Sequence, residues 1–431
     1  MGSALRSPKL RRILAAYTVN RLGTWFGLVA LSLVVFDHTH SALAVAALLF
    51  AWQALPAFVV PAVVARVEAS RRRSELSGLY LFEAVATAAL AILLLWHFWL
   101  PAVLLLAALD GTAALAASAL LRTEVARAAR AQVEAQSESA TRPGESLKED
   151  AREAEREANA ALNVAFSATF VLGPALGGVV VAAAGAPAAL FIDVGSFLIC
   201  GVLLLDLHPR VEEAEGDSVR ARLRAAWRHI NEAPSLRGLL VLEAIALVFF
   251  QSQGPIGVPY AKATLHAGDR GFGLLMTMWG AGAVLGGIIF ARSPRRPLGA
   301  MLSAGALAVG LAYLGFAAAP SLVLACIAAL IGGVGNGVEA PSLISLVQRL
   351  TPPRLHGRLM GAVESLAALS IAIGLPLGGV LVAVSSPRVA FLVVGLGAVA
   401  TAGALLRQSL GRAEPEGEGE TPATAAKSGT R

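Results

Sequence analysis

The sequence predicts an all-α membrane protein with twelve transmembrane helices in two pseudo-symmetric six-helix bundles. Three observations support this fold class: an apolar composition, twelve apolar stretches long enough to span a bilayer, and a sequence repeat between the two halves. Of the 431 residues, 56% are hydrophobic and 15% are charged, whereas about 25% of the residues of a soluble domain are charged. The mean hydropathy is +0.68. A soluble domain of this composition would lack the polar side chains to cover its surface.

Each expected span contains the roughly 20 apolar residues that cross a bilayer. Turn residues such as Gly185 and Pro187 separate neighbouring stretches. The first stretch begins with basic residues but is too long for a signal peptide and leads directly into the second, so we expect it to be retained. The twelve spans are expected at 13–36, 41–65, 76–97, 99–121, 159–184, 186–206, 238–260, 271–291, 298–318, 321–347, 357–384 and 387–407.

The basic residues predict the orientation in the membrane. If the N-terminus is inside, 31 of the 35 Lys and Arg residues fall in inner segments, three fall in outer loops and Arg21 lies within a span. Lys and Arg are retained on the cytoplasmic side, so both termini are expected there. This distribution also explains the net charge of +6 without nucleic acid as a partner. Arg greatly outnumbers Lys, which is typical of GC-rich bacteria, so we expect the bacterial inner membrane.

A repeat relates the two halves of the chain. Residues 178–191 resemble residues 379–392, and each segment follows a Pro and a Gly-Gly pair and joins the fifth span of its half to the sixth. A duplicated half is a common plan in transporters. We therefore expect a bundle over 1–206, a cytoplasmic linker with an amphipathic helix over 207–237, a bundle over 238–411 and a disordered tail over 412–431. The polar segment 122–158 is expected to be a loop that becomes helical from Glu145.

Several strings resemble the major facilitator superfamily. Gly173-Pro174-Ala175-Leu176-Gly177-Gly178 resembles its antiporter motif, with Thr169 in place of the first Gly. The strings that start at Asn20, Phe272, Gly332 and Gln348 resemble the branch with macrolide-efflux and enterobactin-export proteins. The resemblance implies export driven by proton antiport. Gly173, Gly177 and Gly178 are expected to leave a groove for a helix of the other half beside a bend at Pro174, so Gly177→Leu is expected to hold the halves apart.

One motif departs from the superfamily. The loop between its second and third spans usually reads G-x-x-x-D-R-x-G-R-R, and here the initial Gly and the Asp are missing. The basic end remains as Arg71, Arg72 and Arg73, and Glu68 could replace the missing acid. These four residues are the expected inner gate.

Charged residues inside the spans are the main functional signal. A charge at mid-bilayer costs about 2.5–3.5 kcal/mol on the insertion scale, so it persists where it is paired or faces water. The superfamily resemblance implies that spans one, four, seven and ten line a central cavity, and these spans carry Arg21, Asp110, Glu243 and Glu339. A carboxyl group that moves between dry and wet surroundings can carry a proton. Glu83, Asp193 and Glu364 lie outside this set and are expected to make structural or gate contacts.

We therefore expect a proton-coupled exporter of amphipathic molecules in contact with the lipid bilayer. The alternatives are a transporter of one metabolite, such as a siderophore, and a scaffold or receptor that does not transport. No cofactor or metal site is expected, and the sequence lacks a phosphate-binding loop or nucleophile motif, so it is not expected to be an enzyme. Candidate substrate contacts are aromatic or amide residues: Trp25, Phe250, Gln251, Gln253 and Asn336.

Overall fold

The computed structural model describes residues 7–60, 75–137, 144–205, 228, 230–351 and 356–410. Within these ranges, twelve helices are long and apolar enough to cross a membrane, which confirms the predicted fold class. The elements are α1 (Pro8–Thr39), α2 (Ala42–Leu49), η2 (Phe50–Ala54), α4 (Glu75–Trp96), α5 (Leu100–Ser137), α6 (Gly144–Ala184), α7 (Ala186–Leu203), α9 (Pro234–Pro259), η3 (Tyr260–Thr264), α10 (Gly268–Ala291), α11 (Leu298–Ala318), α12 (Leu322–Arg349), α13 (His356–Val384) and α14 (Pro387–Leu410).

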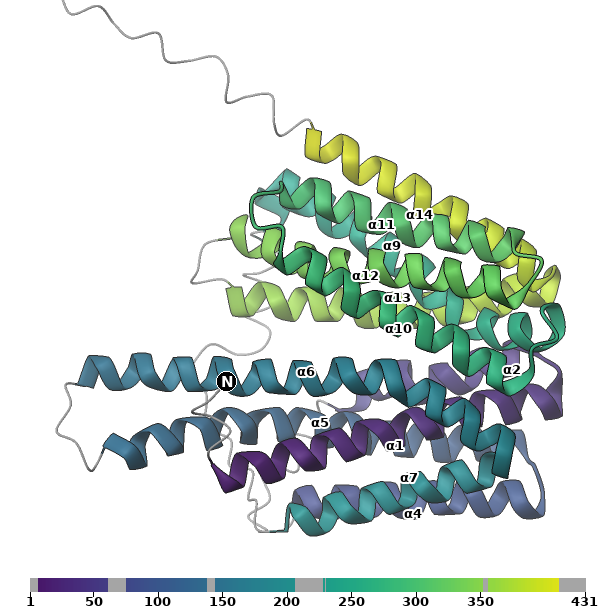
Figure 1. Ribbon diagram of the computed structural model, residues 1–431, viewed down its shortest axis with the longest axis horizontal. Coiled ribbons are helices and arrows are strands. Elements are labelled where there is room, and N and C mark those ends of the chain that lie inside the picture. Colours follow the sequence, from purple (N-terminus) through teal and green to yellow (C-terminus); the bar gives the residue numbers. More distant parts are fainter. Residues whose placement is uncertain are drawn as a thin grey trace, which may run out of the picture.

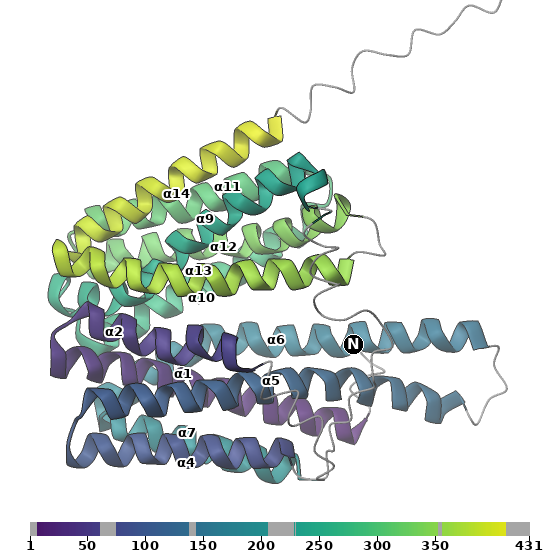
Figure 2. The same cartoon turned by 180° about the vertical axis from the view of Figure 1, so that it is seen from behind.

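The two ends of the molecule differ in their connections. Six turns lie at one end, here named the short-loop end; they join α1 to α2, α4 to α5, α6 to α7, η3 to α10, α11 to α12 and α13 to α14. Ser41 and Ser321 accept hydrogen bonds from backbone N–H groups of the helices that follow them, and Gly185 has a φ of 83°, which favours glycine. We name the opposite end, where α1 begins and α14 ends, the terminal end (Figures 1 and 2).

The helices form an N bundle (α1 to α7) and a C bundle (α9 to α14) (Figure 1). A single apolar core near the short-loop end includes residues of both bundles, such as Val29 and Leu190 with Tyr260 and Phe391. Toward the terminal end each bundle has a separate core. Because apolar burial stabilises the contact between the bundles at one end, this structure is closed at the short-loop end.

Glycines bring the two bundles into backbone contact in a pseudo-symmetric way. On α6, a Cβ atom at Gly178 would lie 3.0 Å from Cα of Gly273 on α10. On α13, a Cβ atom at Gly379 would lie 2.7 Å from Cβ of Ala46 on α2. Each contact joins the fifth span of one half to the second span of the other. Both glycines belong to the repeat, so the duplicated sequence corresponds to a duplicated contact.

The structure corrects the expected role of Gly177. Its α-carbon faces α1 of the same bundle, where an added Cβ would lie 3.4 Å from Cα of Phe26, and Gly173 faces Trp25. The contact across the bundles is made by Gly178 and by the Pro174 carbonyl, which lies near Gly273. A helix presents successive residues 100° apart, so the motif string alone did not show which of two adjacent glycines faces the other half.

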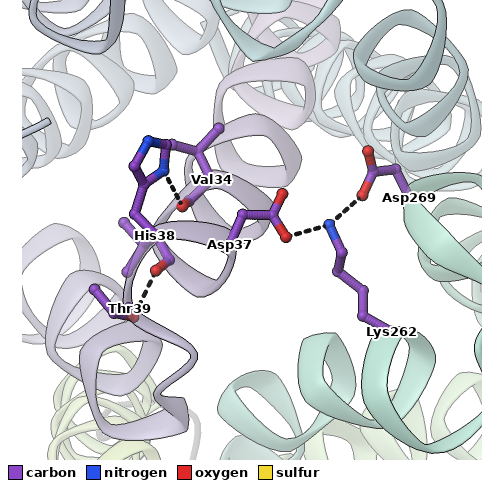
Figure 3. Close-up of polar contacts among 7 residues, drawn as sticks. Val34, Asp37, His38, Thr39, Lys262 and Asp269 are labelled. Atoms are coloured by element: carbon purple, nitrogen blue, oxygen red, sulfur yellow. Dashed lines mark hydrogen bonds and ion pairs between the residues drawn. The ribbon is translucent and has the colours of Figure 1, made fainter. Parts of the chain in front are cut away.

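An ion pair also joins the bundles at the short-loop end. Nζ of Lys262, in η3, lies 2.6 Å from Oδ1 of Asp37 on α1 and 2.6 Å from Oδ1 of Asp269 on α10 (Figure 3). Asp37 belongs to the N bundle, whereas Lys262 and Asp269 belong to the C bundle. This arrangement of three charges therefore stabilises the closed short-loop end.

Helices α5 and α6 extend beyond the rest of the bundle at the terminal end (Figures 1 and 2). Their 38 and 41 residues exceed the roughly 20 residues that span a bilayer. Residues 122–137, expected as loop, are helical because alanines and Val125 form an apolar face on α5 that packs with Ala154 and Ala158 of α6. Arg130 and Glu155 form an ion pair between the two helices. The expected helix from Glu145 is present.

Three expectations concern residues outside the described ranges. The inner-gate residues Glu68, Arg71, Arg72 and Arg73 lie there, as do most of the expected linker helix and the tail from 412. They stay predictions from the sequence.

Gly178→Leu is expected to separate the two bundles at the short-loop end, because the side chain must occupy the contact with Gly273. Spin labels at 99 and 385 in a cysteine-free background report the separation as a distance. Gly195→Leu is the matched control, since nothing lies within 4 Å of a Cβ atom at Gly195. An unchanged distance in the Gly178 variant would contradict the contact.

Asp37→Asn is expected to favour opening of the short-loop end more than Asp269→Asn, because only Asp37 pairs across the bundles. Partly exposed ion pairs contribute about 0.5 kcal/mol, so the ratio of open to closed molecules should change roughly twofold. Single-molecule energy transfer between dyes at the same two positions measures this ratio. Equal effects of the two substitutions would argue against a role between the bundles.

Candidate functional site

A cavity of about 330 Å³ lies in the N bundle and is here named the main cavity. Its wall combines aromatic rings with a few polar groups, which is typical of a site for a small organic molecule. One residue, Ile371, comes from the C bundle. The described lining residues are Tyr17, Asn20, Arg21, Thr24, Trp25, Leu28, Trp52, Gln53, Pro56, Tyr80, Gly111, Ala114, Leu115, Ser118, Leu121 and Ile371.

A π-helical turn shapes one wall of this cavity. Trp52 and Gln53 lie in η2, between the two α-helical parts of the second span. Such turns occur often at functional sites because they alter the direction of neighbouring side chains. The turn packs closely on α5, since a Cβ atom at Gly111 would lie 2.1 Å from the Trp52 carbonyl oxygen. Glycine at 111 therefore permits the position of the Trp52 backbone.

A second, smaller cavity of about 20 Å³, the carboxyl cavity, adjoins the main cavity. Asp110 on α5 lies here, 7% exposed. Its Oδ2 accepts a hydrogen bond from Nε1 of Trp52 at 3.1 Å, and its Oδ1 accepts one from Oγ1 of Thr87 at 3.0 Å. Asp110 is ten residues from the start of α5, so it lies roughly 15 Å from the short-loop end. The structure thus places this carboxyl group deep in the bundle with two donors.

Two more carboxyl groups lie near Asp110. Asp193 on α7 lines the same small cavity and accepts a hydrogen bond from Oγ of Ser196 at 3.2 Å. Glu83 on α4 is fully buried, and its charge interacts with those of Asp110 and Asp193. Neither carboxyl oxygen of Glu83 has a hydrogen-bond partner in the described part of the chain. We name Glu83, Asp110 and Asp193 the carboxyl cluster of the N bundle.

Arg21 faces the main cavity rather than the carboxyl cluster. Its guanidinium lies over the ring of Phe166, 5.1 Å from the centroid. Nε is buried without a hydrogen-bond partner, and no ion pair joins Arg21 to an acid within the described ranges. Arg21 is the one charged side chain among the described residues that line the main cavity. It is therefore available to a polar or anionic group of a bound molecule.

The remaining two acids of the expected cavity set lie together in the C bundle. Glu243 on α9 and Glu339 on α12 are 4% and 9% exposed, and their charges interact. Glu339 packs against α11, where a Cβ atom at Gly305 would lie 2.9 Å from Cβ of Glu339. Neither acid is among the described lining residues of the main cavity. The four expected residues thus lie in separate places: Arg21 in the main cavity, Asp110 beside it, and the two glutamates in the other bundle.

The residues expected to contact the substrate also lie in different places. Trp25 lines the main cavity and packs on Phe170, with ring centroids 5.2 Å apart. Gln253 lines a separate cavity of about 50 Å³ in the C bundle, and Phe250 packs against Trp279. The other two candidates, Gln251 and Asn336, are not among the described lining residues of either cavity.

The sequence analysis missed the placement of Asp193 and Glu83 beside Asp110. One signal was present for Asp193. Gly23 and Gly27 are spaced four residues apart on α1, and Cβ atoms there would lie 2.4 Å and 2.6 Å from the Asp193 carboxyl oxygens. Residues four apart share a helix face, so the pair marks a face of α1 with room for a polar side chain. Glu364, in contrast, is exposed.

Comparisons with known proteins support a family. The sequence model of the Major Facilitator Superfamily matches residues 239–430. An uncharacterized MFS-type transporter, YfiS of Bacillus subtilis, is 27% identical over 237 residues, which are 52% of this chain and 57% of that protein. The multidrug efflux pump Tap of Mycolicibacterium fortuitum is 26% identical over 236 residues, or 53% of this chain and 57% of Tap. These matches span little more than half the length of either relative, and they do not single out the macrolide and enterobactin branch.

Solved structures agree in fold over nearly the whole chain. The nucleoside transporter NupG superposes with a TM-score of 0.68 at 13% identity, over 93% of this chain and 99% of NupG. An auto-inhibited POT family peptide transporter gives a TM-score of 0.67 at 11% identity, over 97% of this chain and 99% of that one. The superfamily consists of transporters rather than enzymes, in agreement with the sequence analysis. The chain thus has the fold of the major facilitator superfamily, its residues 239–430 match the sequence model of that family, and it is distantly related to the bacterial multidrug efflux pump Tap.

Proposed function

We propose that the chain is a secondary active transporter that exports amphipathic small molecules in exchange for protons. The observation that carries this proposal is the contact between two cavities. The main cavity has aromatic walls for an apolar molecule, and the adjoining carboxyl cavity holds Asp110. A binding site and an ionisable group that share a wall are the minimum that coupled transport requires, because each must influence the other.

The proposed orientation determines which side of the membrane each end of the molecule faces. If both termini are cytoplasmic, the short-loop end faces outward and the terminal end faces the cytoplasm of a bacterial cell. The closed short-loop end then makes this structure inward-facing. Alternating access would require the contacts of Gly178, Gly379 and Lys262 to open while the terminal end closes.

The relatives support the direction of transport. Tap is named a multidrug efflux pump, and this chain is distantly related to it. The main cavity fits such a role, since Trp25, Trp52 and Tyr80 offer flat apolar surfaces with polar edges. Tolerance of many substrates follows when apolar contact, rather than a fixed set of hydrogen bonds, provides most of the affinity.

One observation favours a second candidate, transport of a single anionic metabolite. Arg21 faces the main cavity with no acid paired to it in the described part of the chain, and a guanidinium binds carboxylate or phosphate well. A non-transporting scaffold is less favoured, because buried carboxyl groups have a cost that a scaffold need not bear. A panel of cationic, neutral and anionic dyes in transport assays separates the first two candidates.

Asp110→Asn is expected to abolish transport driven by a pH gradient while the protein remains folded. Asn keeps the shape of the side chain and its hydrogen bond from Trp52 but cannot exchange a proton. Uptake of rhodamine 6G into proteoliposomes with an imposed gradient measures the effect, and equilibrium exchange of the dye without a gradient checks that binding survives.

Glu364→Gln is the matched control, because Glu364 is an exposed carboxyl on α13. We expect this variant to transport like the wild type. Gradient-driven uptake at the wild-type rate by the Asp110 variant would exclude Asp110 as an essential proton carrier.

A further inference from the structure

Trp52 belongs to both cavities of the N bundle. Its side chain lines the main cavity and the carboxyl cavity, and its Nε1 donates to Oδ2 of Asp110 at 3.1 Å. Thr24, Leu28 and Ala114 also line both cavities, but Trp52 is the one of these four that hydrogen-bonds to Asp110 in the described ranges. Trp52 therefore lies where the proposed substrate site and the proposed proton site meet.

We propose that Trp52 is the positioning residue that links occupancy of the main cavity to protonation of Asp110. This inference rests on the proposed function and names the side chain through which its two sites communicate. A bound molecule that packs on the ring holds Trp52 in the position seen here, with its N–H directed at Asp110.

The hydrogen bond determines whether occupancy of the main cavity favours or disfavours a proton on Asp110. An N–H donor stabilises a carboxylate more than a neutral carboxyl group, because the charged acceptor makes the stronger bond. Occupancy of the main cavity thus favours loss of the Asp110 proton. Conversely, a proton on Asp110 weakens the bond and lets the ring leave the wall, which disfavours the bound molecule. By thermodynamic reciprocity the two effects are equal in size. The bound molecule and the proton on Asp110 disfavour each other, as exchange of one for the other requires.

Among the described residues around Asp110, Trp52 is the one that connects this carboxyl group to the main cavity. From α4 it is faced by Thr87 and by the charge of Glu83, and from α7 by Asp193. Thr87 and Asp193 line the carboxyl cavity but not the described wall of the main cavity. On α1, Arg21 lines the main cavity and not the carboxyl cavity. Substrate and proton sites therefore meet at the indole of Trp52.

The chain offers two controls that separate the properties of Trp52. Thr87 also donates to Asp110, but it is not part of the main-cavity wall. Trp25 lines the main cavity, and its Nε1 is buried without a partner, so Trp25→Phe removes the same N–H group from the same cavity without touching Asp110.

The test measures the affinity of full-length protein in nanodiscs for rhodamine 6G and for 8-anilinonaphthalene-1-sulfonate across a pH series. In the wild type, affinity should fall as the pH falls. Trp52→Phe should lose that pH dependence, about tenfold for one charge-assisted hydrogen bond, and its affinity should stay near the low-pH value of the wild type across the series. Thr87→Val should shift the midpoint of the profile but keep its amplitude. Trp25→Phe should keep both.

A wild-type amplitude in Trp52→Phe overturns the inference, as does an equal loss in Trp25→Phe. Wild-type proteoliposomes that show gradient-driven transport in the same study keep the proposed function in place when the inference fails. If the wild type neither binds nor transports either dye, the proposed function fails and the inference fails with it. Trp52→His keeps a ring N–H, and partial recovery of the amplitude supports the role of the donor.

Discussion

Close contact between glycines at the short-loop end determines how the two bundles meet. Gly178 on α6 and Gly379 on α13 allow backbone approach that any larger side chain would prevent. Small residues are the usual means of such packing between membrane helices, where lipid offers no hydrophobic drive for association. Because these contacts and the shared apolar core lie at one end, each bundle has a core of its own toward the other end. The Lys262 ion pair adds a weaker, polar contact that can break and form again.

The cost of burying charge explains the interior of the bundles. Glu83, Asp110, Asp193, Glu243 and Glu339 are each at most 9% exposed. A buried polar group without partners is costly and is retained where it has a function. In the N bundle the acids come from three different helices and lie beside a cavity, whereas the two acids of the C bundle lie apart from it. This asymmetry between otherwise related halves supports the proposal that proton exchange takes place in the N bundle.

Length and composition were sufficient to predict the fold. The apolar stretches predict the short-loop ends of the spans to within a few residues, whereas α5 continues to Ser137 where a loop was expected. The repeat at 178–191 and 379–392 predicts the pseudo-symmetry. The rotation of each helix about its own axis could not be predicted from the sequence. A one-residue difference rotates a side chain by 100°, so Gly177 faces α1 whereas Gly178 faces α10. For the same reason the sequence did not show that Asp193 and Glu83 lie near Asp110, or that Glu339 is not among the described residues that line the main cavity. The π-helical turn that contains Trp52 was not predicted from the sequence.

We propose that occupancy of the main cavity and a proton on Asp110 oppose each other. Proton release upon binding tests it most directly. In a weakly buffered solution, rhodamine 6G or 8-anilinonaphthalene-1-sulfonate is added to the protein in nanodiscs, and the change in pH is recorded beside the bound fraction. Binding is expected to release protons from the wild type, whereas Asp110→Asn is expected to bind the dye and release none. Saturable binding to the wild type with no release of protons, at any pH where the protein transports, would contradict it.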